Sequence, residues 1–396
     1  MRWPTAVSTS AKIEAPMSDV LYTNARVVLR HDVLPHASVR VVNGLISDID
    51  SSQSQHPSAI DCEGDLLIPG LVEVHTDNLE RHVTPRPKVN FPMQSAVQAH
   101  DAEIASAGIT TVLDAIGVGD PYGEGFRSRD QSELLRVLDA LQAAHVLRAD
   151  HLIHVRCELP APNARELFEP FAHHARLRLI SLMDHTPGQR QWSDIEHARI
   201  YYTGKKGWSN AQFDEEVRIA PQRQAQYAQP NRAWFADFAR THQVALATHD
   251  DTTTEHVEEA LQLGAVMSEF PTTLAAAQRA RERGLSTVAG APNVVRGGSH
   301  SGNVSAIELA KAGVLDALSS DYVPSSLLHA AWRLQREAGY SLPEALAVVT
   351  RGPALACGLH DRGEIALGLR GDLVRVREVA GAPVVCEVRV LGRRVA

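Results

Sequence analysis

The hydrophobic positions of this chain follow two different rhythms. Between residues 20 and 69, and again after residue 370, apolar residues form short runs separated by turn residues. Between residues 70 and 359, apolar runs of strand length alternate with longer segments of helical periodicity. Short runs bounded by turn residues predict strands, and the longer amphipathic segments predict helices. The pattern therefore predicts two β-rich ends around a long α/β middle.

The two β-rich ends are predicted to form one unit. Asn43-Gly44 lies between two apolar runs near the N-terminus, which is typical of a two-residue hairpin. The stretches GDLVRVREV and PVVCEVRVLGRRV near the C-terminus show the same pattern of short apolar runs. We expect a small β-sandwich domain built from both termini, residues 20–69 and 360–396. Residues 1–19 precede it, and we interpret this polar stretch as a frayed, disordered extension or a misassigned start.

The middle of the chain, residues 70–359, contains eight strand-like runs, each followed by a helix-like segment. Glycines such as Gly264 and Gly284 end these segments and suit helix C-caps. Eight such units predict an α/β fold, the (β/α)₈ TIM-type barrel. A doubly wound open sheet is the alternative, but no GxGxxG motif follows the first run. The runs are residues 71–77, 109–116, 151–159, 177–185, 244–250, 265–271, 285–292 and 315–322.

Imidazole and carboxylate side chains stand where several of these runs end. The C-terminal ends of barrel strands carry the chemistry in TIM-type enzymes. Side chains two residues apart on a strand point to the same side, so the first run can aim both of its polar groups at one ion. Mixed nitrogen and oxygen donors suit Zn²⁺, Mn²⁺ or Fe²⁺. The candidate ligands, sufficient for one or two divalent ions, are His75, Asp77, Glu158, His185, His249 and Asp321.

Each candidate ligand also has a simpler interpretation when it is taken alone. Glu158 could be a solvated loop carboxylate, and Asp321 could cap the helix that follows it. His185 and His249 could be ordinary hydrogen-bonding residues. Their joint placement at the ends of the strand-like runs favours a metal site, in which Glu158 would bridge two ions.

Cationic and glycine-rich segments follow three of the runs. Arg81 and His82 follow the first run, Lys205 lies in TGKKG, and Arg296 and His300 lie in NVVRGGSHSGN. Glycine-rich backbone beside an arginine is suited to phosphate binding. An ordinary solvated turn is the alternative for Lys205. Because the whole chain carries a net charge of −8, cations grouped near the barrel mouth predict a polyanionic substrate.

Composition limits the class of protein further. The chain has 396 residues, 44% hydrophobic and 22% charged, which is typical of a globular protein with a large core. The acidic balance and the 5% aromatic content disfavour a nucleic-acid partner. The four cysteines are far apart and indicate a reducing compartment. With no apolar run long enough for a signal peptide or membrane helix, we expect a cytoplasmic protein without a membrane partner.

Several motifs resemble the amidohydrolase superfamily over essentially the whole chain after Val20. The entry IPGLVEVHTD and the exit GEIALGLRGDLVRV are typical of it. HTDNLERHVTPRPKVNFP, GGSHSGN and SSDYVPSSLLHAAW are similar to its phosphonate-metabolism branch, which serves the carbon–phosphorus lyase pathway. The resemblance implies hydrolysis of α-D-ribose 1-methylphosphonate 5-triphosphate, a phosphorylated ribose, to the 5-phosphate and pyrophosphate.

The resemblance also implies roles for the candidate residues. The six ligands would hold the ions, and Asp321 would orient the attacking water and accept its proton. Arg81, His82, Lys205, Arg296 and His300 would neutralise the triphosphate. A homodimer is one assembly state that the family suggests. The chain departs from the wider superfamily in having HxD after the first strand, where most members have HxH, and no lysine at the end of the fourth.

Two rival functions remain at this stage. A cyclic-amide hydrolase or deaminase on the same barrel would share the ligands but require fewer cations. A non-catalytic subunit of a phosphonate-processing assembly would be expected to lack some ligands, whereas the whole set is present here.

Overall fold

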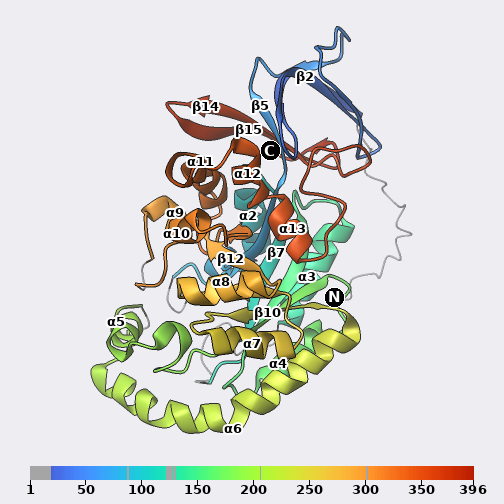
Figure 1. Ribbon diagram of the computed structural model, residues 1–396. Coiled ribbons are helices and arrows are strands. Elements are labelled where there is room, and N and C mark those ends of the chain that lie inside the picture. The colour runs from blue at the N-terminus through green and yellow to red at the C-terminus, as the bar shows by residue number, and fades with distance from the viewer. Residues whose placement is uncertain (1–18, 87–88, 122–126, 128–130, 206, 300–301) are drawn as a thin grey trace, which may run out of the picture.

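The computed structural model describes residues 19–86, 89–121, 127, 131–205, 207–299 and 302–396 (Figure 1). It contains a parallel barrel sheet and a second, mainly antiparallel sheet to which both ends of the chain contribute. The α/β class, the TIM-type barrel and the small β unit from both termini are therefore confirmed. Within the described residues, no helix combines the length and apolar character needed to cross a membrane.

The terminal sheet joins strands from opposite ends of the sequence. β5 (Leu66–Pro69) pairs parallel with β1 (Val20–Val28) and antiparallel with β14 (Leu373–Val379). The predicted hairpin at Asn43-Gly44 links β2 to β3, and both residues have positive φ. The remaining strands of this sheet are β2 (Val33–Val42), β3 (Leu45–Asp50), β4 (Ile60–Asp61), β15 (Ala382–Val390) and β16 (Arg393–Arg394).

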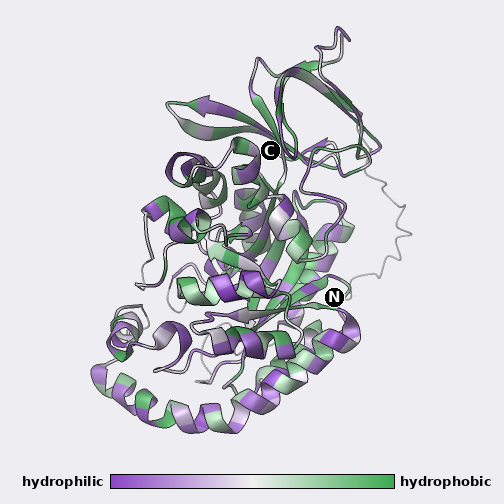
Figure 2. Ribbon diagram, in the orientation of Figure 1, coloured by the Kyte–Doolittle hydropathy of each residue, from purple (hydrophilic) through white to green (hydrophobic). Residues whose placement is uncertain are grey.

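The barrel strands pair in chain order, each parallel to the next. All ten residues of β7 are buried, because helices cover the outer face of the strand while the opposite face lines the barrel. The central strands are accordingly rich in hydrophobic residues in Figure 2. The strands are β6 (Leu71–Thr76), β7 (Ile109–Val118), β8 (Asp150–Glu158), β9 (Leu177–Met183), β10 (Ala245–His249), β11 (Met267–Glu269), β12 (Ser286–Gly290) and β13 (Ala317–Ser319).

Helices surround the barrel and pack their apolar sides on its strands. They are α1 (Asn78–Val83), α2 (Met93–Ser106), α3 (Ser132–Ala143), α4 (Ala164–Phe168), α7 (Thr254–Gln262), α8 (Leu274–Glu282), α9 (Ala291–Arg296), α10 (Ala306–Lys311), α11 (Ser326–Ala338), α12 (Leu342–Ala347) and α13 (Arg351–Ala356).

The connection from β9 to β10 is the longest between barrel strands. It contains α5 (Ile195–Lys205) and the 33-residue α6 (Asn210–His242). Two prolines inside α6, Pro221 and Pro230, interrupt its backbone hydrogen bonding, and the helix curves along the lower side of the molecule in Figure 1. The first part of the glycine-rich TGKKG segment is helical, because α5 ends only at Lys205.

A buried glutamate joins the first and last strands of the barrel. β6 and β13 meet at an isolated bridge between Thr76 and Asp321. One carboxylate oxygen of Glu73 accepts the backbone N–H of His75, and the other accepts that of Ser320, both at 2.6 Å. Burial raises the pKa of Glu73 to about 7. This closure places the end of β6 beside the end of β13, although the two segments are far apart in sequence.

Candidate metal centre

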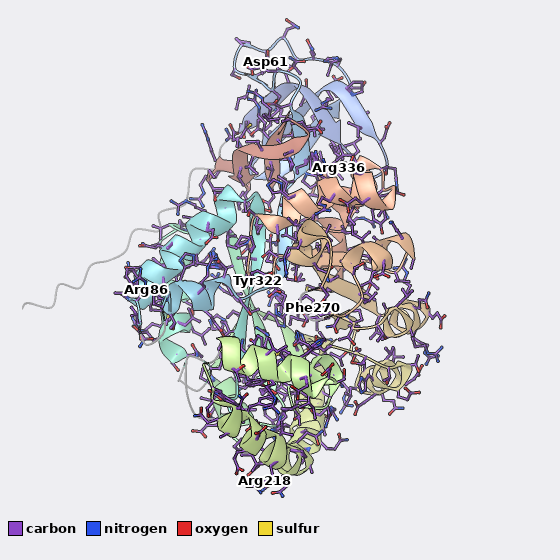
Figure 3. The ribbon with its side chains drawn as sticks, turned by 90° about the vertical axis from the view of Figure 1, so that its left-hand side faces the viewer. Asp61, Arg86, Arg218, Phe270, Tyr322 and Arg336 are labelled. Carbon is purple, nitrogen blue, oxygen red and sulfur yellow. The ribbon has the colours of Figure 1, made fainter. Side chains whose placement is uncertain are left out.

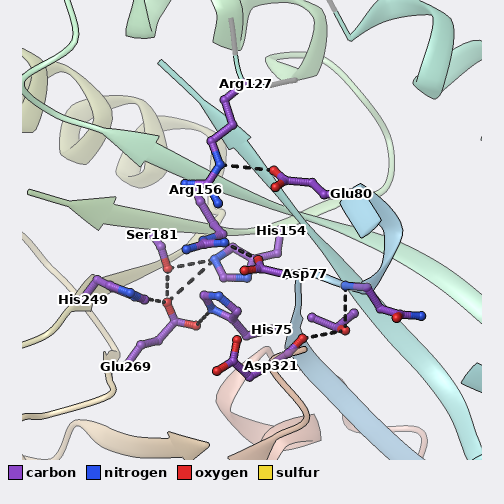
Figure 4. A network of polar contacts seen from close by, with 12 residues as sticks. His75, Asp77, Glu80, Arg127, His154, Arg156, Ser181, His249, Glu269 and Asp321 are labelled. Atoms are coloured by element: carbon purple, nitrogen blue, oxygen red, sulfur yellow. Dashed lines mark hydrogen bonds and ion pairs between the residues drawn. The ribbon is translucent and has the colours of Figure 1, made fainter. Parts of the chain in front are cut away.

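His75, His249 and Glu269 form a buried cluster at the C-terminal end of the barrel (Figure 4). His249 and Glu269 are direct neighbours on the paired strands β10 and β11. Nδ1 of His75 lies 3.0 Å from one Glu269 oxygen, and Nδ1 of His249 lies 3.5 Å from the other. One donor atom from each residue lies within 4.8 Å of the others. This spacing and donor chemistry fit a divalent ion such as Zn²⁺, Mn²⁺ or Fe²⁺.

The surroundings of Glu269 keep its carboxylate ionised. Burial by itself raises the pKa of this group, but attraction to His75 and His154 and hydrogen bonds from the histidines hold the pKa well below its usual range. The Ser181 hydroxyl donates to the same carboxylate. Burial lowers the pKa of His154 to about 3, and Nδ1 of this ring donates to the Val74 carbonyl. The negatively charged Glu269 carboxylate therefore lies between the imidazole rings of His75 and His249, where it can serve as an oxygen ligand.

A second group of possible ligands shares His249 with the first. His185, His249 and Asp250 each offer a donor atom within 4.8 Å of the others. Glu158 lies against His185, whose Nδ1 is 2.5 Å from one carboxylate oxygen and whose backbone N–H donates to the other at 3.0 Å. Burial raises the pKa of Glu158, but attraction and hydrogen bonds to His185 outweigh it and lower the pKa to about 2. The two groups of possible ligands therefore lie side by side, with His249 in both.

Asp77 and Asp321 lie next to each other at the point where the barrel closes. The Asp77 N–H donates to the Asp321 carbonyl at 2.8 Å, and the Asp321 N–H donates to the His75 carbonyl at 3.1 Å. The Asp77 carboxylate forms an ion pair with Arg156. Figure 4 places the Asp321 side chain beside His75. Of the six predicted ligands, His75, His185 and His249 belong to the two groups of possible ligands, and Glu158 contacts His185. Asp77 and Asp321 belong to neither group and lie beside His75 through these main-chain contacts.

Left-handed backbone conformations occur at the ends of three barrel strands. Asp250, Phe270 and Asp321 have φ values of 57°, 53° and 54°, which non-glycine residues rarely adopt. The Phe270 ring packs edge-on against His75 and His249, with centroids 4.9 and 5.1 Å apart. Figure 3 shows Phe270 and Tyr322 near the middle of the molecule. Strained backbone of this kind is often retained where a functional site depends on it.

The predicted phosphate-binding cations are less closely grouped. Arg81 and His82 both contact Glu103 on α2, at 2.9 and 2.8 Å. Arg296 is exposed at the end of α9, in the connection that follows β12. The side chain of Lys205 and the whole of His300 lie outside the described residues. Arg86, which also follows the first strand, is exposed at the edge of the molecule in Figure 3.

Four residues near the centre were not assigned from the sequence. Glu269 and Asp250 meet the criterion used for the predicted ligands, because each stands at the end of a barrel strand. Arg156 lies two residues before Glu158 on the same strand, so both side chains point to the same face. This spacing could have indicated that Arg156 lies near the predicted ligands. Nothing in the sequence singles out Arg127, whose place depends on how the connection after β7 folds.

Comparison with known proteins agrees with the fold. The profile of the amidohydrolase family (Amidohydro_3) matches residues 92–387. The chain is 46% identical over 361 residues to the α-D-ribose 1-methylphosphonate 5-triphosphate diphosphatase of Escherichia coli (strain K12), covering 90% of this chain and 94% of that protein.

Solved structures share the architecture at low sequence identity. N-isopropylammelide isopropylaminohydrolase from Burkholderia multivorans aligns with a TM-score of 0.63 at 18% identity, covering 96% of this chain and 98% of that one. Molinate hydrolase aligns with a TM-score of 0.65 at 14% identity, covering 95% and 94%. Likeness at this level of identity is informative about the fold alone.

Proposed function

Because this chain belongs to the amidohydrolase family, we propose that it is a metal-dependent diphosphatase. Its substrate would be α-D-ribose 1-methylphosphonate 5-triphosphate, cleaved to the 5-phosphate and pyrophosphate in phosphonate use. The observation that carries the proposal is the 46% identity to a diphosphatase of that name over nearly the full length of both chains. The substrate would be a phosphorylated small molecule, and the homodimer stays a prediction.

The residues of the barrel mouth can be given roles in this reaction. His75, His185, His249, Asp77, Glu158 and Asp321 would hold one or two divalent ions, together with Glu269 and Asp250. Such an ion, when bound, supplies Lewis acidity at the attacked phosphorus and lowers the pKa of the attacking water.

Asp321 would orient that water and accept its proton as a general base. Hydrogen bonds to His75 and Asp77 fix its main chain, so the backbone that carries the carboxylate is held in place. The Phe270 ring, packed on His75 and His249, would limit access of bulk water to this part of the site. Arg296 and the other predicted cations would neutralise the phosphate chain.

The test is the identity of the phosphate product. The purified chain, stripped of metal and reloaded with Zn²⁺ or Mn²⁺, is given ribose 1-methylphosphonate 5-triphosphate, and pyrophosphate and orthophosphate are measured separately. We expect metal-dependent release of pyrophosphate and none from the stripped protein. Orthophosphate as the only product would rule out attack at the α-phosphorus. No hydrolysis by any reloaded form would favour an amide- or amine-cleaving relative.

A second prediction concerns Arg296. Arg296→Ala is expected to raise KM for the triphosphate by roughly threefold to tenfold, because an exposed cation contributes modestly to anion binding. kcat and metal content should stay unchanged, since Arg296 lies in α9 rather than among the ligands. Steady-state kinetics and elemental analysis measure the three quantities. An unchanged KM would remove Arg296 from the substrate-binding set.

A further inference from the structure

A buried arginine lies inside the barrel mouth, beside the candidate ligands. Arg156 is on β8 and faces inward like His154 and Glu158, which stand two residues before and after it. The residue is only 5% exposed. Its position combines a permanent positive charge with a place next to the candidate metal centre.

The hydrogen-bonding capacity of Arg156 is only partly used. Its Nη1 contacts Asp77, while its Nε is buried and has no hydrogen-bond partner among the described residues. A guanidinium carries five N–H donors, and a buried cation is costly unless its donors are satisfied by anionic or polar partners. The site is therefore suited to accept a further anion beside Arg156.

A second arginine lies on the same side of the centre. Nε of Arg127 is 3.2 Å from Glu80 on α1. Attraction to Glu80 first, and also to Asp77 and Glu158, raises the pKa of Arg127 well above its usual value. Gly117 provides the space, because a Cβ there would lie 2.6 Å from the Arg127 side chain. In Figure 4 Arg127 and Arg156 lie one above the other, each against a carboxylate.

We propose that Arg156 and Arg127 form a phosphate-binding subsite for a di- or triphosphate ligand, with Asp77 and Glu80 holding the two guanidinium groups when no phosphate is bound. Planar guanidinium groups match the oxygens of phosphate and can bind them in pairs. Asp77 is also a candidate metal ligand, and its engagement there would leave Arg156 available to phosphate. The subsite rests on the proposed function and names the groups that would hold the phosphate chain.

Binding of inorganic pyrophosphate tests this subsite without a catalytic readout. Pyrophosphate is titrated calorimetrically into the full-length Mn²⁺-loaded protein, its Arg156→Gln and Arg127→Gln variants, and Arg156→Lys. Each glutamine variant is expected to bind about tenfold to a hundredfold more weakly, the loss expected for a charge-assisted hydrogen-bonding group. Arg156→Lys should fall between, since it keeps the charge and loses the planar fork.

Arg178→Gln is the matched control. Arg178 lies near the beginning of β9, at the opposite end of the barrel, where it donates to two backbone carbonyls. This variant should bind pyrophosphate like the wild type. Metal content after each titration and circular dichroism show whether a variant has lost its ions or its fold.

The outcomes separate this subsite from the proposed function. Wild-type affinity in both glutamine variants would overturn it, as would a loss explained entirely by lost metal or lost fold in both. Weaker binding with metal and fold retained would support it, even if the ribose triphosphate proved not to be a substrate. In that case the diphosphatase proposal alone would fail.

Discussion

Replacing Glu269 with glutamine is expected to reduce metal retention and kcat/KM by on the order of 100-fold or more. Even residues that only orient metal ligands contribute 10–100-fold in affinity or activity, and Glu269 is placed as a ligand itself. Its carboxylate lies between His75 and His249, and both contacts depend on negative charge. A glutamine has nearly the same shape but offers a single neutral oxygen.

The measurement is metal content after dialysis against a weak chelator, followed by steady-state kinetics. Glu387→Gln is the matched control, because Glu387 is a buried glutamate of the terminal sheet that contacts Tyr22 and Arg389. It should retain its metal and most of its activity. A Glu269→Gln protein with wild-type metal content would show that the ions are held without this carboxylate.

Replacing Asp114 with asparagine is expected to destabilise the fold by about 3–5 kcal/mol, the usual cost of removing one partner from a buried ion pair. The Asp114 carboxylate on β7 lies 2.7 Å from Nε2 of His100 on α2 and 2.8 Å from Nδ1 of His151 on β8. His151 also contacts Asp101 of α2, at 3.3 Å, and all four side chains are almost fully buried.

His100, Asp114 and His151 have the composition of a metal site, but each nitrogen of the two rings already has a polar partner. Nδ1 of His100 lies 3.0 Å from the side-chain amide of Asn78. The other three ring nitrogens contact the carboxylates of Asp114 and Asp101. The network is satisfied as a set of hydrogen bonds. It also reaches Asn78, the residue after Asp77, and so links the outer layer of the barrel to the candidate metal centre. We expect Asp114→Asn to act mainly through stability.

Urea-induced unfolding measures this effect, with Asp139→Asn as the control. Asp139 is on α3 and its side chain is 53% exposed in its contact with His174, so its loss should change the free energy of unfolding by about 0.5 kcal/mol or less. A similarly small effect of Asp114→Asn would show that the buried network contributes little net stability.

The same network predicts a dependence on pH. Burial lowers the pKa of His151, but attraction to Asp114 and hydrogen bonds to Asp101 and Asp114 raise it to about 10 in the folded protein. The groups facing it are Asp114, Asp101 with its partner Arg148, and His100, whose own pKa burial lowers. A raised histidine pKa stabilises the fold fully below pH ~6.5, and this contribution is lost as pH rises toward 10. The difference between wild type and Asp114→Asn should therefore shrink between pH 7 and 10, and a constant difference would contradict the charged state of His151.

The sequence by itself determined the architecture and most of the candidate ligands. Alternating strand-like and helix-like runs can pack stably in only a few architectures, and eight such parallel units close into a barrel. His75, Glu158, His249 and Asp321 could be named because the ends of parallel strands meet at one face, which is a consequence of topology rather than of side-chain detail. Glu269 satisfied the same rule and could have been found by applying it to every strand.

Only the tertiary structure decided which charged groups face one another. Glu73 closes the barrel by binding backbone N–H groups from β6 and β13, so His75 and Asp321 become neighbours across 246 positions of sequence. Arg81 and His82 are predicted to bind phosphate, and the structure shows that both contact Glu103. No sequence pattern indicated the ion pairs that Arg156 and Arg127 form with Asp77 and Glu80. Periodicity determines the face on which a side chain lies. The side chain that it contacts there depends on how elements distant in sequence pack together. The local sequence pattern does not determine that packing.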